Sequence, residues 1–154
     1  MDDVQLANYV AGIDPGPVEA GRISRDIAEY LGVPEGSVIL LSDYNLTKTK
    51  FRHKEIDFQD YIKLPDILAE GFVIPGNRNR SVEICHLDVS TSDYRFWALC
   101  LKVTREEEVF MTMFHRFNLK EARRLYRRAQ RRDELIRDHQ NELARRILRR
   151  ARSA

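Results

Sequence analysis

The sequence contains few of the residues that hold metal ions or form disulfides. It has two cysteines and four histidines among 154 residues. Cys85 and Cys100 lie in separate apolar runs without CxxC spacing, and the histidines form no HExxH pattern. We therefore expect no metal site and no cofactor, and we expect reduced, buried thiols. A disulfide between two paired strands is the less favoured alternative.

Long apolar runs are also missing from the chain. None reaches the roughly 18 residues that a membrane span requires, and the start MDDVQLANYV carries acids where a secretory signal has lysine or arginine. With 43% hydrophobic residues, the chain can bury a core of its own. We expect a cytoplasmic protein without a membrane partner.

Charge is divided unevenly along the chain. Residues 118–154 contain 13 Lys and Arg against five Asp and Glu, whereas residues 1–117 contain 13 against 19. The net charge of +2 thus combines an acidic body with a basic tail. This asymmetry is typical of a contact with nucleic acid or with an acidic protein surface, including the protein's own body.

The hydrophobic patterns predict an α+β fold. Helical spacing is followed by the apolar run SVILLS at 37–42, and helical spacing returns after His53, with Asp57 at the position of an N-cap. Strand-like segments begin at 72, 81, 94 and 108, with short polar linkers between them. We expect N-terminal helices packed on a curled antiparallel β-sheet of about four to five strands, followed by a long basic C-terminal helix. The predicted regions are an N-terminal helical segment (1–36), an α+β core (37–117) and an arginine-rich helix (118–154).

Seven polar residues do not fit a pure packing pattern: His53, Tyr94, Arg95, Lys102, Thr112, His115 and Arg116. Five of them are the candidate catalytic residues: His53, Lys102, Thr112, His115 and Arg116. Antiparallel pairing about the TREE turn places Lys102 near Val109 or Phe110, with Thr112 one short step further. Histidines suit both proton transfers of metal-independent RNA cleavage, and fixed cations suit the charge that grows on the phosphoryl oxygens. Three of the candidates also have a structural interpretation: His53 as a solvated residue before a helix, Lys102 as a lysine snorkelling from a sheet edge, and Thr112 as a good strand former.

A family resemblance supports the catalytic interpretation. The segment LSDYNLTKTKFRHKEIDFQDYIKLPDILAEGFVI, with YRFWALCLKVT and EVFMTMFHR, resembles the phage-associated branch of the barnase, EndoU, colicin and RelE-like (BECR fold) nuclease superfamily. The resemblance covers about residues 38–117. It places His53 at the histidine of the RHKEI segment, Lys102 in the penultimate strand, and Thr112, His115 and Arg116 at the polar end of the last strand. It implies a small ribonuclease, often used as a toxin or phage effector.

Two functions remain open at this point. The first is an endoribonuclease that acts by 2′-hydroxyl attack on RNA such as tRNA or mRNA. The second is a non-catalytic phage or mobile-element module whose basic helix binds nucleic acid or a protein such as an antitoxin or immunity protein. The expected RNA contacts are Lys50, Arg52, Tyr94, Arg95, Arg123, Arg124, Arg127, Arg128 and Arg131.

Overall fold

The structure is a computed structural model that describes residues 3–13, 16–90 and 92–150. The elements in chain order are α1 (Asp3–Val10), β1 (Val18–Arg22), α2 (Arg25–Leu31), β2 (Val38–Leu41), α3 (Asp43–Arg52), α4 (Phe58–Ile62), α5 (Leu64–Glu70), β3 (Phe72–Pro75), β4 (Ser81–Asp88), β5 (Arg95–Val103), β6 (Val109–Phe117), α6 (Leu119–Arg131), β7 (Arg137–Asp138) and α7 (Glu142–Arg149).

The strands form a single mixed sheet in the order β1-β2-β6-β5-β4-β3-β7. The meander of β3, β4, β5 and β6 is antiparallel throughout. The pairing of β2 with β6 is parallel, and it joins the two strands only at Ile39 and Leu40, opposite Val109 and Phe110. Among the described residues, most of the outer edge of β6 therefore lacks a neighbouring strand.

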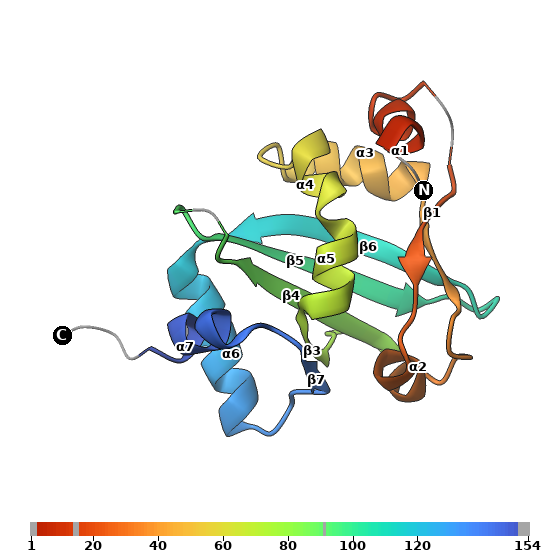
Figure 1. The fold of residues 1–154 in the computed structure, drawn as a ribbon. Helices are drawn as coiled ribbons and strands as arrows, with labels where there is room; N and C mark the ends of the chain where they lie inside the picture. The colour runs from red at the N-terminus through yellow and green to blue at the C-terminus, as the bar shows by residue number, and fades with distance from the viewer. Residues whose placement is uncertain (1–2, 14–15, 91, 151–154) are drawn as a thin grey trace.

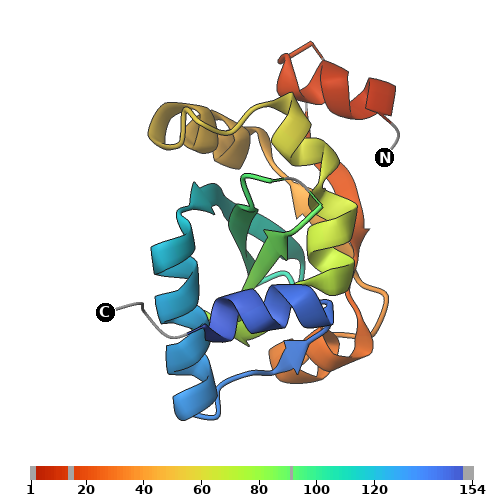
Figure 2. The ribbon, with the colours of Figure 1, turned by 60° about the vertical axis from the view of Figure 1, so that its left-hand side comes forward.

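The sheet is covered on both faces, and each face has its own hydrophobic core (Figures 1 and 2). Residues of α1 to α5 pack with Ile84, Trp97 and Leu99 on one face. On the other face, α6 and α7 pack with Phe72 and Phe96. The alternation of side chains along each strand separates the two sets. This three-layer arrangement leaves parts of β6 half-exposed, including Met113 and His115.

The predicted fold class was wrong in three respects. The chain is α+β, but the sheet has seven strands rather than four or five, it is mixed rather than antiparallel, and it is open rather than curled closed. Two strands that we did not expect, β1 and β7, form its edges. β1 lies within the segment that we expected to be helical, and its sequence VEAGR alternates apolar and polar residues over only the first three positions, too short a run to mark a half-buried strand.

The predicted long basic helix was also wrong, because the chain turns back after α6. Asp133 has a φ of 52°, in the left-handed region that ends helices. Beyond it, Arg137 is buried and donates hydrogen bonds to the carbonyl oxygens of Leu68 and Gly71. A buried cation is tolerated only with such partners, so β7 is fixed against β3 and α7 begins separately. Residues 151–154 of the predicted helix lie outside the described residues.

No helix in the described part of the chain is long and apolar enough to cross a membrane.

Candidate active site

Two histidines that are distant in the sequence meet at the exposed edge of β6. The ring centroids of His53 and His115 are 5.0 Å apart, with an angle of 51° between the planes. His115 also packs edge-on against Phe117, with a centroid separation of 4.1 Å. His53 is the residue at which α3 ends, and its backbone N–H donates to the Thr49 carbonyl. The pair therefore joins a helix end to a strand.

Helix α3 reaches the site because it packs along the part of β6 that β2 leaves unpaired (Figure 1). The helix begins where the Ser42 side chain accepts a hydrogen bond from the Asn45 N–H. Leu46 and Thr49 are buried toward the sheet. Sequence reasoning missed this helix, although a serine N-cap followed by Asp43 in the first turn is a helix-start signal.

A small pocket of about 50 Å³ lies beside the histidines. Its lining residues are Lys48, Thr49, Arg52, His53, Thr112 and Met113. The pocket thus combines one imidazole of the pair with two cations from α3. Lys48 and Thr49 were not among the predicted residues, because the helix that aligns them with His53 was not predicted.

The two imidazoles have different electrostatic surroundings. Burial and the neighbouring His53 lower the pKa of His115 to about 4, against a smaller opposing effect of Glu55. His115 is therefore neutral at pH 7 and can accept a proton. Nδ1 of His53 lies 3.6 Å from a carboxylate oxygen of Glu55, which can pair with the imidazolium form. The site thus offers a neutral imidazole next to one with an acidic partner.

Arg116 does not share the sheet face of His115, because successive strand residues point to opposite faces. Its guanidinium donates to the Glu55 carbonyl at 2.5 Å, and its Nε lies 3.5 Å from Oδ1 of the buried Asp60. The same Asp60 oxygen accepts a hydrogen bond from Trp97 Nε1 at 2.9 Å. Arg116, predicted as a catalytic cation, thus ties β6 to the loop after His53. We call Asp60, Trp97 and Arg116 the bracket.

Lys102 has the register that we expected, since it pairs with Phe110. It is four residues along β5 from Ala98, the partner of His115, a distance of about 13 Å at the usual rise per residue. Lys102 is half-buried and lies toward the β5–β6 turn, away from the histidines. The structure does not bring it to the pair.

Thr112 occupies an irregularity in the β5–β6 pairing. Cys100 pairs with Met113 and Leu101 with Met111, so Thr112 is the extra residue of a bulge. Its hydroxyl lies 3.5 Å from the Cys100 carbonyl oxygen. The bulge places Thr112 in the pocket lining beside His53.

The residues expected to contact RNA are distributed over three regions. Arg52 lines the pocket, whereas Lys50 donates to the Val10 carbonyl of α1 and is held away from it. Tyr94, with a φ of 44°, precedes β5, and Arg95 lies 3.4 Å from Asp93. The remaining five lie on α6: Arg123, Arg124, Arg127, Arg128 and Arg131.

Within residues 3–13, 16–90 and 92–150, no group of three or more His, Cys, Asp or Glu side chains could hold a metal ion. Cys85 and Cys100 are free thiols; Cys85 is buried and Cys100 half-buried. The chain matches no known family model, no curated protein and no solved structure.

Proposed function

We propose that this protein is a metal-independent endoribonuclease that cleaves RNA by attack of a 2′-hydroxyl on the adjacent phosphate. The observation that carries this proposal is the 5.0 Å separation of the His53 and His115 rings beside a pocket that contains Lys48 and Arg52. An acid, a base and fixed positive charge near one phosphate are what the reaction needs.

In this mechanism His115 is the general base. It is neutral at pH 7 because its pKa is lowered to about 4, so an unprotonated nitrogen is present to take the 2′-hydroxyl proton. The 2′-oxygen then forms a bond to phosphorus. A base with so low a pKa is fully in its neutral, active form at pH 7, but it accepts a proton only weakly. The rest of the rate enhancement must therefore come from stabilisation of the phosphorane.

His53 is the general acid. In its protonated form it can pair with Glu55, and it delivers that proton to the 5′-oxygen as the bond from phosphorus to that oxygen breaks. The products are a 2′,3′-cyclic phosphate and a free 5′-hydroxyl. Lys48 and Arg52 offset the charge that develops on the non-bridging oxygens. Arg116 acts through Glu55 and Asp60 as a positioning residue rather than as a phosphate ligand.

The biological setting that we propose is a toxin or phage or mobile-element effector acting on tRNA or mRNA in the cytoplasm. The free thiols and the basic C-terminal region support this setting. The protein partner that we propose is an antitoxin or immunity protein that contacts the basic C-terminal region. The basic face of α6 also suits the non-catalytic alternative, whereas the contact between the His53 and His115 imidazoles favours catalysis.

The test is incubation of purified wild-type protein with a mixed RNA pool in excess EDTA. We expect cleavage by the wild type and its loss in both His53→Asn and His115→Asn. Cleavage that persists in both variants would contradict the proposed site. Absence of cleavage by a folded wild-type protein on every RNA tested would favour the non-catalytic module.

A further inference from the structure

The outer face of α6 carries a row of cations. Lys120, Arg124, Arg127 and Arg131 recur at spacings of four, three and four residues and therefore lie on one side of the helix. We call these four residues the α6 stripe. The stripe spans about 16 Å at 1.5 Å per residue. It begins at the second residue of α6, and α6 directly follows β6, the strand that contains His115.

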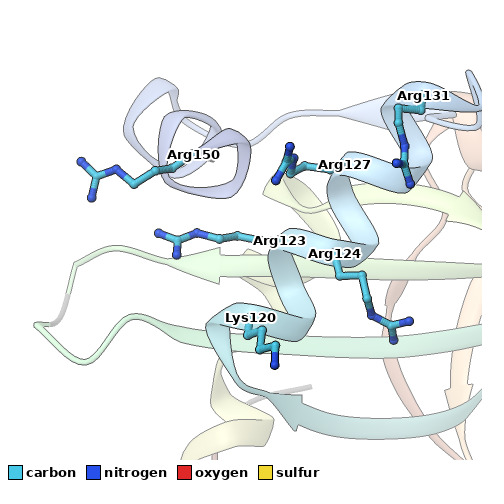
Figure 3. A pocket seen from close by; sticks show the side chains of 6 residues that line it. All are labelled: Lys120, Arg123, Arg124, Arg127, Arg131 and Arg150. Atoms are coloured by element: carbon cyan, nitrogen blue, oxygen red, sulfur yellow. The ribbon is translucent and has the colours of Figure 1, made fainter. Parts of the chain in front are cut away.

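The stripe borders a basic pocket of about 480 Å³ between α6 and the end of α7. Arg123 and Arg150 complete the lining, and none of the described lining residues is acidic. Figure 3 shows the six side chains projecting from the two elements, with Arg123 and Arg150 extending in the same direction. Arg123 is fixed there because its Nε donates to the Ile147 carbonyl.

The positive charges of α6 are poorly neutralised, in contrast to those of α7. On α7, Glu142 pairs with Arg145, Arg146 and Arg149 at 3.2 to 4.0 Å. On α6, Glu121 pairs with Arg124, but no ion pair within the described part of the chain involves Lys120, Arg127 or Arg131. Like charges one turn apart destabilise a helix. An anionic ligand would relieve that repulsion.

The chemistry of the stripe favours duplex RNA over single strands. Proteins that hold single strands interleave cations with aromatic rings on which bases stack. The aromatic residue of α6, Tyr126, is 1% exposed, so the stripe presents cations alone. Cations without stacking partners bind phosphates, and a duplex offers phosphates from two strands while hiding its bases.

The proposed active site, unlike the stripe, requires an unpaired nucleotide. In-line attack by a 2′-oxygen requires a nucleotide free to leave helical geometry, and such a nucleotide is unpaired. Helix α3, which supplies Lys48 and Arg52 to the pocket, also exposes Tyr44 and Phe51, with exposed fractions of 74% and 78%. Such aromatic rings are the kind on which unpaired bases stack. The histidine pair at the edge of β6 thus suits an unpaired loop, and α6, which follows β6 in the chain, suits a paired stem.

We infer that the α6 stripe is a phosphate-binding exosite for the duplex stem of a folded RNA whose unpaired loop is cleaved at the histidine pair. The inference rests on the proposed function for the cleavage step. The binding step stands separately and can be measured without any catalysis.

The experiment compares Arg127→Gln/Arg131→Gln with Arg22→Gln/Arg25→Gln, which removes the same charge from exposed positions outside the stripe. Glutamine keeps helix propensity close to that of arginine, and thermal melts establish that both variants are folded. The probes are a fluorescent RNA hairpin and an unpaired RNA strand of equal length, both 2′-O-methylated throughout, so that neither contains a 2′-hydroxyl that could attack the adjacent phosphate. A third substrate, a dinucleoside phosphate, reports cleavage alone.

We expect the wild type to prefer the hairpin and the stripe variant to bind the hairpin about tenfold or more weakly at low salt. The slope of its salt dependence should fall by about one unit for each phosphate that the variant no longer neutralises. The Arg22 and Arg25 variant should match the wild type, and cleavage of the dinucleoside phosphate should be the same in all three proteins.

Unchanged hairpin affinity in the stripe variant would overturn the exosite and point instead to an acidic protein. An equal reduction of affinity for the hairpin and the single strand would overturn the preference for a stem. A wild type that binds the hairpin through the stripe but cleaves no RNA would remove the proposed catalysis and leave the exosite.

Discussion

His115 lies in a setting that keeps its imidazole neutral, and its role as a base depends on that. Replacement of His115 by Asn should lower kcat/KM by about 10² to 10⁴, the usual contribution of general acid–base catalysis. Replacement of His53 by Asn should have an effect of similar size. His139 is exposed in the chain between β7 and α7, so His139→Gln is the matched control and should retain full activity. Steady-state cleavage of a defined RNA provides the measurement.

The pH dependence follows from the pKa of His115, which falls from 6.5 to about 4. The base is active in its neutral form, so kcat/KM should decline on the acid side only near pH 4. An acid limb close to pH 6.5 would show that His115 is not the base. A pH–rate profile in EDTA, with parallel tests that the protein remains folded, decides between the two.

The same shift predicts how stability responds to acid. Between pH 6.5 and about 4 the unfolded chain binds a proton at His115 that the folded chain does not. The contribution of this residue to the free energy of unfolding is therefore complete above pH 6.5 and is lost as the pH falls through that window. His115→Asn should lose less stability than the wild type over this range. Denaturant titrations at several pH values would detect the difference, and parallel curves would contradict it.

Replacing Asp60 in the bracket should change two measurable properties, the stability of the protein and its rate of cleavage. Asp60→Asn should cost about 1 to 3 kcal/mol of stability, because a buried carboxylate that accepts from Trp97 and from the Asp57 N–H is replaced. The loop after His53 should loosen, which lowers kcat more than it raises KM. Trp97 is the single tryptophan, so its fluorescence reports the change directly. The exposed Asp66→Asn is the control and should leave fluorescence and kcat unchanged.

At the scale of elements, the proposed active site depends on α3, since this helix and its C-cap His53 bring Lys48 and Arg52 to the pocket beside the His53 imidazole. Ser42 starts the helix, and Ser42→Ala should cost about 1 kcal/mol. The exposed Ser92→Ala should cost close to nothing. Thermal or denaturant unfolding compares the two variants. Equal stabilities would show that the Ser42 cap contributes nothing to α3.

Some of the elements and their pairings could be predicted from the sequence, and others could not. The antiparallel β5–β6 pair was predictable in register, because the apolar alternation on both sides of the TREE turn leaves few alternatives, and Asp57 is the N-cap that was expected. His53 and His115 were both named as candidates from the chemistry of RNA cleavage, and in the fold their rings lie together. α3 was not predicted, since DYNLTKTKFR has only two residues buried and shows little apolar periodicity.

Other elements could not be predicted from the sequence, because their conformation depends on tertiary contacts rather than on local sequence preference. β1 and β7 are short edge strands whose pairing depends on neighbours far away in the sequence. The break after α6 depends on Arg137, which is satisfied by carbonyls of the α5–β3 connection. Arg116 was named as a candidate together with its neighbour His115, and the fold places the two side chains on opposite faces of β6. Both Arg137 and Arg116 look like surface cations in the sequence, and both serve structure in the fold.

At the scale of the whole molecule, the division of charge has a structural counterpart. The acidic excess lies in residues 1–117, while the α6 stripe projects from the face opposite α1 to α5. On the proposed function, the stripe would attract RNA on one side and leave the histidine pair uncovered. This arrangement accounts for a basic region on a body whose own net charge is negative.

The most direct measurement of the central claim is the chemistry of the product ends. A defined RNA is cleaved in EDTA by the wild type, and the fragments are weighed by mass spectrometry. The proposed mechanism predicts a 2′,3′-cyclic phosphate on the upstream fragment, a 5′-hydroxyl on the downstream one, and no cleavage at a site whose upstream nucleotide is 2′-deoxy. Fragments that carry a 5′-phosphate, or cleavage next to the 2′-deoxy nucleotide, would contradict a mechanism in which His115 activates the 2′-hydroxyl.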